Sequence, residues 1–157
     1  MNKKRVYVSS TFADLQAFRA KVNEKLRGAG FELVAMEDYP AFDDRPLSKC
    51  LNDVASCDYY IGIIAWRYGF IPKVNNPDRK SITQLEYEQA CKSGVIRLLF
   101  LLNPDAEWKP NFFDSHSGDG DGGQLIKGFR GYLEAEHGRA YFEEPSELAA
   151  LKEYTEA

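Results

Sequence analysis

A glutamate near the start of a predicted helix is the residue of this chain best suited to chemistry. In the segment Ser81–Ala90, Glu86 shares an arc of about 110° of the helical projection with Ile82, Leu85 and Gln89. A carboxylate in a partly apolar crevice can hydrogen-bond sugar hydroxyls or stabilise an oxocarbenium-like centre at C1 of a ribose. We therefore predict that Glu86 is the catalytic group of a site that acts on a sugar.

The same helix start also permits a purely structural interpretation. Thr83 to Glu86 matches a capping box, in which the glutamate accepts a hydrogen bond from an unpaired backbone N–H. Ser81 to Gln84 is a competing box, and if Ser81 is the cap then Glu86 is not needed for capping and can bind a ligand. We expect Ser81 and Thr83 to contribute to substrate binding beside Glu86.

Small hydroxyl residues follow the first predicted strand, at Ser9, Ser10 and Thr11, with Phe12 next to them. Backbone N–H groups at a helix start, together with the hydroxyls of Ser10 and Thr11, can bind phosphate or ribose oxygens. Helix capping accounts for the same residues, with Ser10 or Thr11 as the N-cap and Asp14 in the first turn. The sequence leaves both interpretations open.

A third polar set follows a nearly continuous apolar strand. Arg67 supplies a positive charge for a phosphate. Trp66 and Tyr68 offer flat surfaces for a base, although packing under a loop is the more common role of such aromatic residues. After the second strand, Glu37 is expected to contact a ribose, with solvation at the surface as the alternative.

These three sets need a sheet that brings them together. Strands alternate with helices along the chain, which predicts a three-layer α/β sandwich of the flavodoxin-like kind, with a five-stranded parallel sheet in the order 2-1-3-4-5. The ligand crevice should lie between the first and third strands. Strands are expected at 6–9, 31–36, 59–66, 95–102 and 139–142, and helices at about 12–28, 46–57, 81–93 and 124–137 and from 145.

Length and composition indicate one domain over residues 1–157, since 44% of the 157 residues are apolar. Residues 103–123 interrupt the alternation with prolines and the run Ser-Gly-Asp-Gly-Asp-Gly-Gly. Such a composition buries little apolar area, so we expect a flexible insertion there.

Charge and residue usage narrow the function classes. A formal net charge of -4 with scattered basic residues disfavours nucleic acid as the main partner. No apolar run approaches the roughly 20 residues of a membrane span and no signal-peptide core precedes the first strand, so we expect a cytoplasmic protein without a membrane partner. The three cysteines and two histidines lack metal-ligand spacing, and we expect no metal site.

Three motifs of the chain resemble the domain of unknown function 4062 family. They are a Val-x-Val-Ser-Ser-Thr-Phe-x-Asp-Leu opening at Val6–Leu15, an Arg-Tyr-Gly turn at Trp66–Gly69, and Ser-x-Thr-x-x-Glu-Tyr at Ser81–Tyr87. The resemblance covers nearly the whole chain and implies a branch of the TIR-like superfamily. Such domains often stand at the amino end of larger NTPase or repeat proteins of immunity and antiphage defence, which implies that this domain is normally fused to such a region.

Thr83–Ala90 is also similar to the Gly-Thr-x-x-Glu-x-Gly-x-Ala stretch of nucleoside deoxyribosyltransferases, whose glutamate attacks or stabilises the anomeric carbon. Glu86 takes that position, while Ile82 and Glu88 replace the glycines. Enzymatic TIR domains use a glutamate on the corresponding helix to break the nicotinamide–ribose bond of NAD. The resemblances imply an NAD glycohydrolase, with NAD as substrate and no cofactor.

Two alternatives remain beside that function. One is a nucleoside or nucleotide N-glycosidase or deoxyribosyltransferase-like enzyme, and the other is a non-catalytic module that associates with further copies through TIR-like surfaces. TIR-like enzymes commonly complete their active site from a neighbouring copy. We therefore expect the isolated domain to be mainly monomeric and poorly active.

Overall fold

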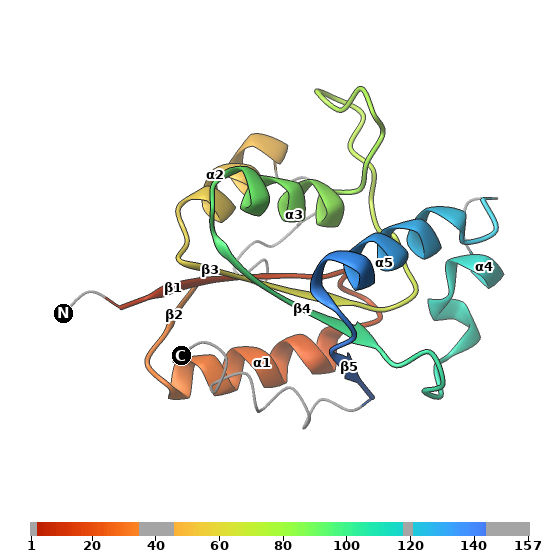
Figure 1. Cartoon of the computed structure of the whole chain (residues 1–157), viewed down its shortest axis with the longest axis horizontal. Coiled ribbons are helices and arrows are strands. Elements are labelled where there is room, and N and C mark those ends of the chain that lie inside the picture. Colours follow the sequence, from red (N-terminus) through yellow and green to blue (C-terminus); the bar gives the residue numbers. More distant parts are fainter. Residues whose placement is uncertain (1–2, 35–45, 118–120, 144–157) are drawn as a thin grey trace.

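The computed structural model is a three-layer α/β sandwich, and it describes residues 3–34, 46–117 and 121–143 (Figure 1). All strand pairs are parallel, and the strand order is β2-β1-β3-β4-β5. Both findings confirm the predicted flavodoxin-like α/β fold. The strands are β1 (Arg5–Ser9), β2 (Glu32–Val34), β3 (Tyr59–Ile64), β4 (Ile96–Leu102) and β5 (Tyr141–Phe142).

The helices divide between the two faces of this sheet. In Figure 1, α1 lies below the sheet and α2, α3 and α5 lie above it. The carboxyl ends of the strands lie toward the right of the view, where a 3-10 turn and the short α4 connect β4 to α5. The bounds are α1 (Gln16–Gly28), α2 (Leu47–Ala55), α3 (Ile82–Lys92), η3 (Pro110–Phe112), α4 (Asp114–Ser117) and α5 (Gln124–His137).

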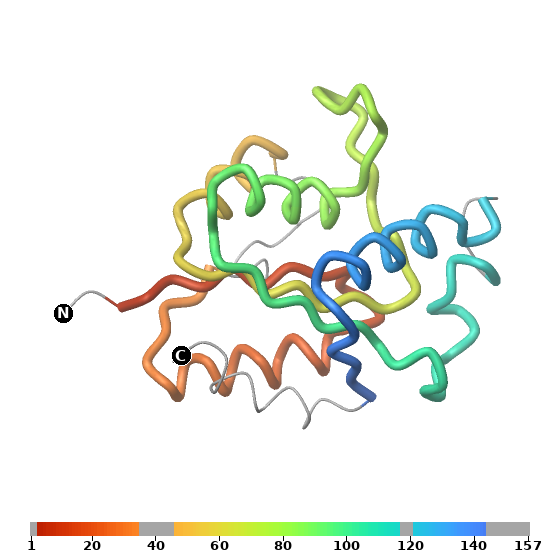
Figure 2. Tube along the Cα trace, viewed as in Figure 1, coloured from red at the N-terminus to blue at the C-terminus, as the bar shows by residue number. Residues whose placement is uncertain are grey.

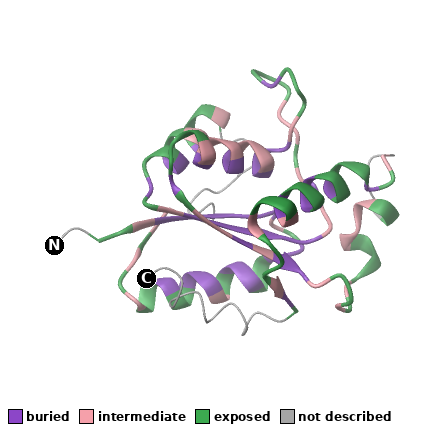
Figure 3. Cartoon of the chain, in the orientation of Figure 1, coloured by how far each residue is buried: buried purple, intermediate pink, exposed green. Residues whose placement is uncertain are grey.

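Each face of the sheet has its own apolar core, because side chains of a strand alternate between faces. Val6 and Val8 of β1 pack with α1, whereas Tyr7 between them packs in the core under α2, α3 and α5. Figure 3 shows the central strands and the inner sides of the helices as buried. Ser9 shares the face of Tyr7, so β1 presents polar groups to α3.

Several boundaries differ from the expected ones. β3 ends at Ile64, two residues before the expected end, and the guanidinium of Arg130 on α5 donates to the carbonyls of Ile64 and Ala65 at 3.3 and 3.1 Å. The end of the second expected strand, at residues 35–36, and the helix expected from Pro145 lie outside the described residues. Within the described ranges, no helix has both the length and the apolar character needed to cross a bilayer.

The segment expected to be a flexible insertion, 103–123, contains η3 and α4 and contacts the turn after β3 (Figure 2). The backbone N–H of Asp114 donates to the carbonyl of Trp66 at 3.0 Å, and the N–H of Tyr68 donates to Asp114 Oδ2 at 2.7 Å. These bonds attach the segment to the carboxyl edge of the sheet. Its flexibility stays a prediction.

Candidate functional site

The three motif regions meet at the carboxyl edge of β1 and β3. Gly69 makes the meeting close, because a Cβ at this position would lie 3.1 Å from Thr11 Cγ2, 3.6 Å from Thr83 Oγ1 and 4.0 Å from Ser81 Cβ. Gly69 also has a φ of 98°, a conformation that favours glycine. The predicted convergence of the loop after β1, the turn after β3 and the start of α3 is therefore present.

Glu86 lies at the inner side of this junction and is completely buried, with 0% of its surface exposed. Ser9 Oγ donates to Glu86 Oε1 at 2.9 Å, and the hydroxyl of Tyr7 donates to Oε2. A buried carboxyl group is costly unless its oxygens are hydrogen-bonded, and these two hydroxyls meet that need. The prediction that Glu86 faces the apolar side of its helix is confirmed.

Tyr7 was not among the predicted site residues, although the sequence held a signal for it. In a strand, residues two apart point to the same face. Since Ser9 was expected beside the ligand, Tyr7 had to share that face. Its phenol reaches Glu86 because α3 packs directly over β1.

Ser81 proves to be the cap of α3, which settles the choice between the two capping boxes. Its side chain accepts a hydrogen bond from the backbone N–H of Gln84 at 3.1 Å. Glu86 is therefore not the box glutamate of Thr83, and it bonds to the sheet instead.

Tyr60 adds a third hydroxyl beside this cluster, and it is fully buried with no hydrogen-bond partner in bonding geometry. Burial raises the pKa of Tyr60 well above its ordinary value; the nearby Ser9 hydroxyl lowers it less, and the negative charge of Glu86 raises it further. The Tyr60 ring lies over Gly62, where a Cβ would come within 3.3 Å of its hydroxyl oxygen. Gly62 thus makes room for a tyrosine beside Glu86.

Ser10 and Thr11 do not cap α1, contrary to one of the two interpretations. The N-cap position is Leu15 and has no side-chain cap, because a turn closed by the Leu15 N–H and the Phe12 carbonyl at 3.1 Å separates the hydroxyl residues from Gln16. The amino end of α1 is therefore displaced from Ser10 and Thr11, and it does not join them in a phosphate site.

The hydroxyls of Ser10 and Thr11 instead make hydrogen bonds within the loop and to α1. Ser10 Oγ donates to the Thr11 carbonyl at 2.6 Å and accepts from the Arg19 guanidinium at 2.9 Å. Thr11 Oγ1 donates to Asp14 Oδ1 at 2.5 Å. These bonds give the loop a fixed shape.

Arg67 lies at the edge of the sheet as predicted, with a carboxylate as its partner. Its guanidinium is 3.5 Å from Asp14 Oδ1, and 34% of the Arg67 side chain remains exposed. Burial raises the pKa of Asp14, whereas the Thr11 hydroxyl and then Arg67 lower it in part. Arg67 can therefore still offer N–H groups to an anionic ligand.

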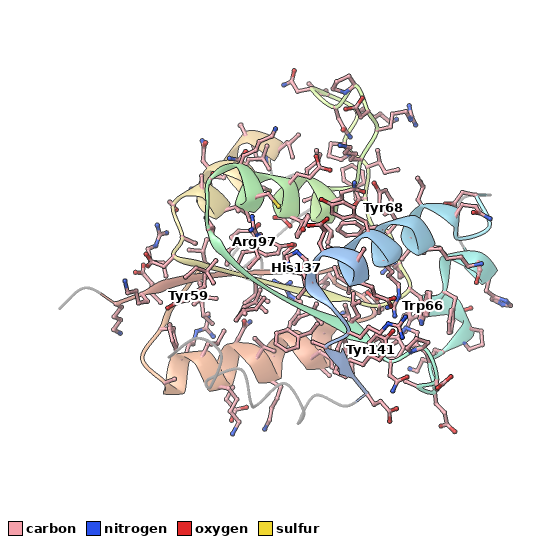
Figure 4. The ribbon with its side chains drawn as sticks, viewed as in Figure 1. Tyr59, Trp66, Tyr68, Arg97, His137 and Tyr141 are labelled. Carbon is pink, nitrogen blue, oxygen red and sulfur yellow. The ribbon has the colours of Figure 1, made fainter. Side chains whose placement is uncertain are left out.

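The aromatic residues of the turn are packed rather than open to a base (Figure 4). The Arg130 guanidinium lies over the Trp66 ring at 4.0 Å from its centroid, and Phe113 stacks on Trp66 with centroids 5.9 Å apart. Tyr68 is buried and its hydroxyl donates to Gln84 Oε1 at 2.6 Å. The packing alternative accounts for both residues in this conformation.

Two further residues were predicted to belong to the site. Phe12 lines a separate groove of about 620 Å³ along α1. Glu37 lies outside the described residues. No group of three or more His, Cys, Asp or Glu side chains is positioned for a metal ion in the described parts of the chain.

Comparison with known proteins identifies the family of the chain. Among curated proteins, none matches the chain significantly. A family model described as a domain of unknown function, DUF4062, matches residues 5–154, which include every motif discussed above. The chain therefore belongs to the DUF4062 family.

Proposed function

We propose that this chain is a TIR-like NAD glycohydrolase domain of a defence or signalling protein, seen in a resting conformation. The observation that carries the proposal is the meeting of the three motif regions at Gly69, at the carboxyl edge of β1 and β3, with Glu86 bonded to Ser9 at the same edge. Ligands of open α/β sheets bind at this edge, where the strand order changes direction.

In the proposed reaction the bond between C1 of the ribose and the nicotinamide nitrogen breaks, and nicotinamide leaves with the electron pair. Water adds to C1 and releases a proton. Glu86 stabilises the positive charge that develops on the sugar, and Arg67 binds the phosphates. The two hydroxyl donors on Glu86 are the contacts that ribose hydroxyls replace when the substrate enters.

The burial of Glu86 defines what activation must do. Because its side chain has no exposed surface, substrate reaches it only after the start of α3 or the turn at 66–69 has moved. Self-association through TIR-like surfaces is the proposed cause of that movement, and fusion to an NTPase or repeat region would promote it.

A non-catalytic interaction module is the second candidate, and the same burial favours it. In that role the hydrogen bonds of Glu86 to Tyr7 and Ser9 attach α3 to β1. The contact between Trp66 and Arg130 attaches α5 to the turn after β3. Either role is compatible with a cytoplasmic location, which we propose because the three cysteines are free thiols, as is typical of a reducing compartment.

The test is nicotinamide release from NAD, measured with wild-type protein and with Glu86→Gln. We expect the variant to lose activity by about 10² or more, the scale of removing a key electrostatic group. Glu88→Gln is the matched control, since Glu88 lies on the same helix, is partly exposed and pairs with Lys80 at 2.9 Å. It should retain turnover.

Other results of the same assay would identify one of the two alternative functions. Base release from nucleoside monophosphates but not from NAD would identify the nucleotide N-glycosidase. If the protein releases no base from NAD or from nucleoside monophosphates, in concentrated and in crowded samples, the non-catalytic interaction module is the function that fits. Equal turnover by Glu86→Gln and wild type would remove Glu86 from the mechanism.

A further inference from the structure

A second groove lies at the carboxyl edge, on the face of the sheet that α1 covers. Its volume is about 470 Å³, within the size range of small-molecule sites. Three aromatic residues make up half of the lining: Trp108 lies 5.7 Å from Phe18 and 6.1 Å from Phe112 between ring centroids. The lining residues are Asp14, Phe18, Glu107, Trp108, Lys109 and Phe112.

Two side chains of this groove have polar atoms without a partner. Asp14 Oδ2 and Trp108 Nε1 are both buried, and neither makes a hydrogen bond. An unsatisfied buried donor or acceptor is rare because each costs about 1–3 kcal/mol. One groove thus combines a free acceptor and a free donor, which a ligand with the complementary pair would satisfy.

Both atoms are covered by the lining of the groove. Neither atom has exposed surface, so a ligand must displace part of the lining to reach them. The adjacent 3-10 turn, η3, is a single turn without a buried residue, and Phe112 at its end is a lining residue. None of the three residues of η3 belongs to either apolar core.

The guanidinium of Arg67 lies next to the Asp14 carboxylate. Arg67 contacts Asp14 Oδ1 at 3.5 Å and keeps part of its side chain exposed. An anionic group on the ligand would find this guanidinium next to the acceptor oxygen. The neighbourhood therefore offers an aromatic slot, one acceptor, one donor and a phosphate contact.

We infer that this groove binds the adenine end of a nucleotide. The base stacks on the Phe112 ring with its edge toward Trp108, its exocyclic amine donates to Asp14 Oδ2, and a ring nitrogen accepts from the in-plane N–H at Trp108 Nε1. Adenine presents such an amine beside a ring nitrogen, whereas a 6-oxo purine presents an oxygen that the carboxylate repels. The Arg67 guanidinium takes the adjoining phosphate.

This inference deepens the proposed function and rests on it for the rest of the ligand. Glu86 lies on the α3 side of the sheet and the groove on the α1 side. A dinucleotide would connect them round the carboxyl edge, past Arg67. Binding of the adenine end, however, can be measured without any catalysis.

The experiment compares AMP with IMP by titration calorimetry on the full chain, because the two differ at the position that faces Asp14. We expect AMP to bind at least tenfold more tightly, since a site built to accept from an amine rejects an analogue that lacks it. Asp14→Asn should abolish that preference. Trp108→Phe, which keeps an aromatic ring and removes the N–H, should weaken AMP binding by about threefold to tenfold.

Controls separate this inference from the proposed function. Asp105→Asn removes an exposed carboxylate from the same segment and should leave AMP binding unchanged. Glu86→Gln should also retain it, so AMP discrimination without NAD turnover would refute only the glycohydrolase. NAD turnover with equal AMP and IMP affinities would refute only the adenine groove.

Two results overturn the groove assignment directly: equal affinities for AMP and IMP in the wild type, or unchanged AMP affinity in Trp108→Phe. Asp14 also bonds to Thr11 and pairs with Arg67, so Asp14→Asn must first be shown to fold by circular dichroism. Trp108→Phe removes neither of these contacts and therefore tests the groove independently.

Discussion

At the scale of single residues, the site depends on side chains that share one face of two neighbouring strands. Tyr7 and Ser9 of β1 bond to Glu86, and Tyr60 of β3 lies beside Tyr7 in the register. All are buried, so a substitution here changes packing and hydrogen bonding together. Gly62, next to Ser9 in the register, allows this crowding.

Gly62→Ala should destabilise the protein by about 1–3 kcal/mol, the cost of overpacking a core. The new Cβ would lie 2.5 Å from Leu99 Cδ1 and 3.1 Å from Tyr60 Cε1. Urea denaturation measures the change. Gly131→Ala is the control: no atom lies within 4 Å of its Cβ position in α5, so it should instead stabilise by about 0.5–1 kcal/mol. A Gly62→Ala protein as stable as the wild type would show that the side chains of Leu99 and Tyr60 can shift to admit the methyl group.

The sequence predicted that Glu86 lies on the apolar side of α3, because helical spacing alone places it there. It did not predict complete burial, since Glu86 was expected in a crevice that a sugar can reach. It did not predict the partners, since Tyr7 lies 79 residues away and its role depends on which helix covers β1. The same limit applies to Trp66: its position at the end of a strand was predictable, but its contact with Arg130 arises from α5.

At the scale of elements, local signals located most helices and strands, and tertiary contacts determined where they end. α5 has the predicted bounds, Gln124–His137, because its apolar positions recur at helical spacing. α1 begins four residues later than expected, since the turn at Phe12–Leu15 is closed by a backbone bond that no side-chain signal announces. Asp114 bonds to the turn after β3 across 46 residues, which the sequence does not encode locally.

We expect the burial of His137, where α5 contacts α3, to make stability depend on pH. The hydroxyl of Tyr87 lies 2.6 Å from His137 Nε2. Burial, and then repulsion by Arg97, lower the pKa of His137 below its ordinary value of 6.5. The folded chain therefore binds fewer protons at this ring than the unfolded chain, and the free energy of unfolding falls as the pH drops from 6.5 through the lowered pKa.

His137→Gln should flatten this acid limb, measured by urea denaturation between pH 5 and pH 7.5 as approximate limits around the ordinary histidine pKa. His116→Gln, at an exposed position on α4, should leave the limb as it is in the wild type. If both variants keep the wild-type slope, other groups cause the acid destabilisation.

At the scale of the whole molecule, the strand order followed from the alternation of strands and helices, because parallel connections leave few topologies. The exposed large apolar residues of the described chain lie in three segments: the loop after β3, the start of β4 and α5. They are Phe70, Val74, Ile96, Leu125 and Tyr132. A stable interface usually has a contiguous apolar centre.

We therefore predict that the isolated chain is mainly monomeric and turns over NAD slowly. Light scattering measures its mass, and an NAD assay over a range of protein concentrations measures whether specific activity rises with association. Rapid turnover by the monomer, independent of concentration, would show that one chain contains a complete site and would end the proposal of control by assembly.

The parallel sheet also determines when this site can form during synthesis. Val6 of β1 pairs with Tyr59 of β3, so one edge of the first strand has no partner until more than fifty further residues have left the ribosome. Glu86 emerges later still, which leaves the phenol of Tyr7 without its carboxylate through that interval. Non-local pairing of this kind slows folding and exposes apolar strands to aggregation. The strand order thus leaves β1, the strand that carries Tyr7 and Ser9, with one unpaired edge for longer than a local hairpin would.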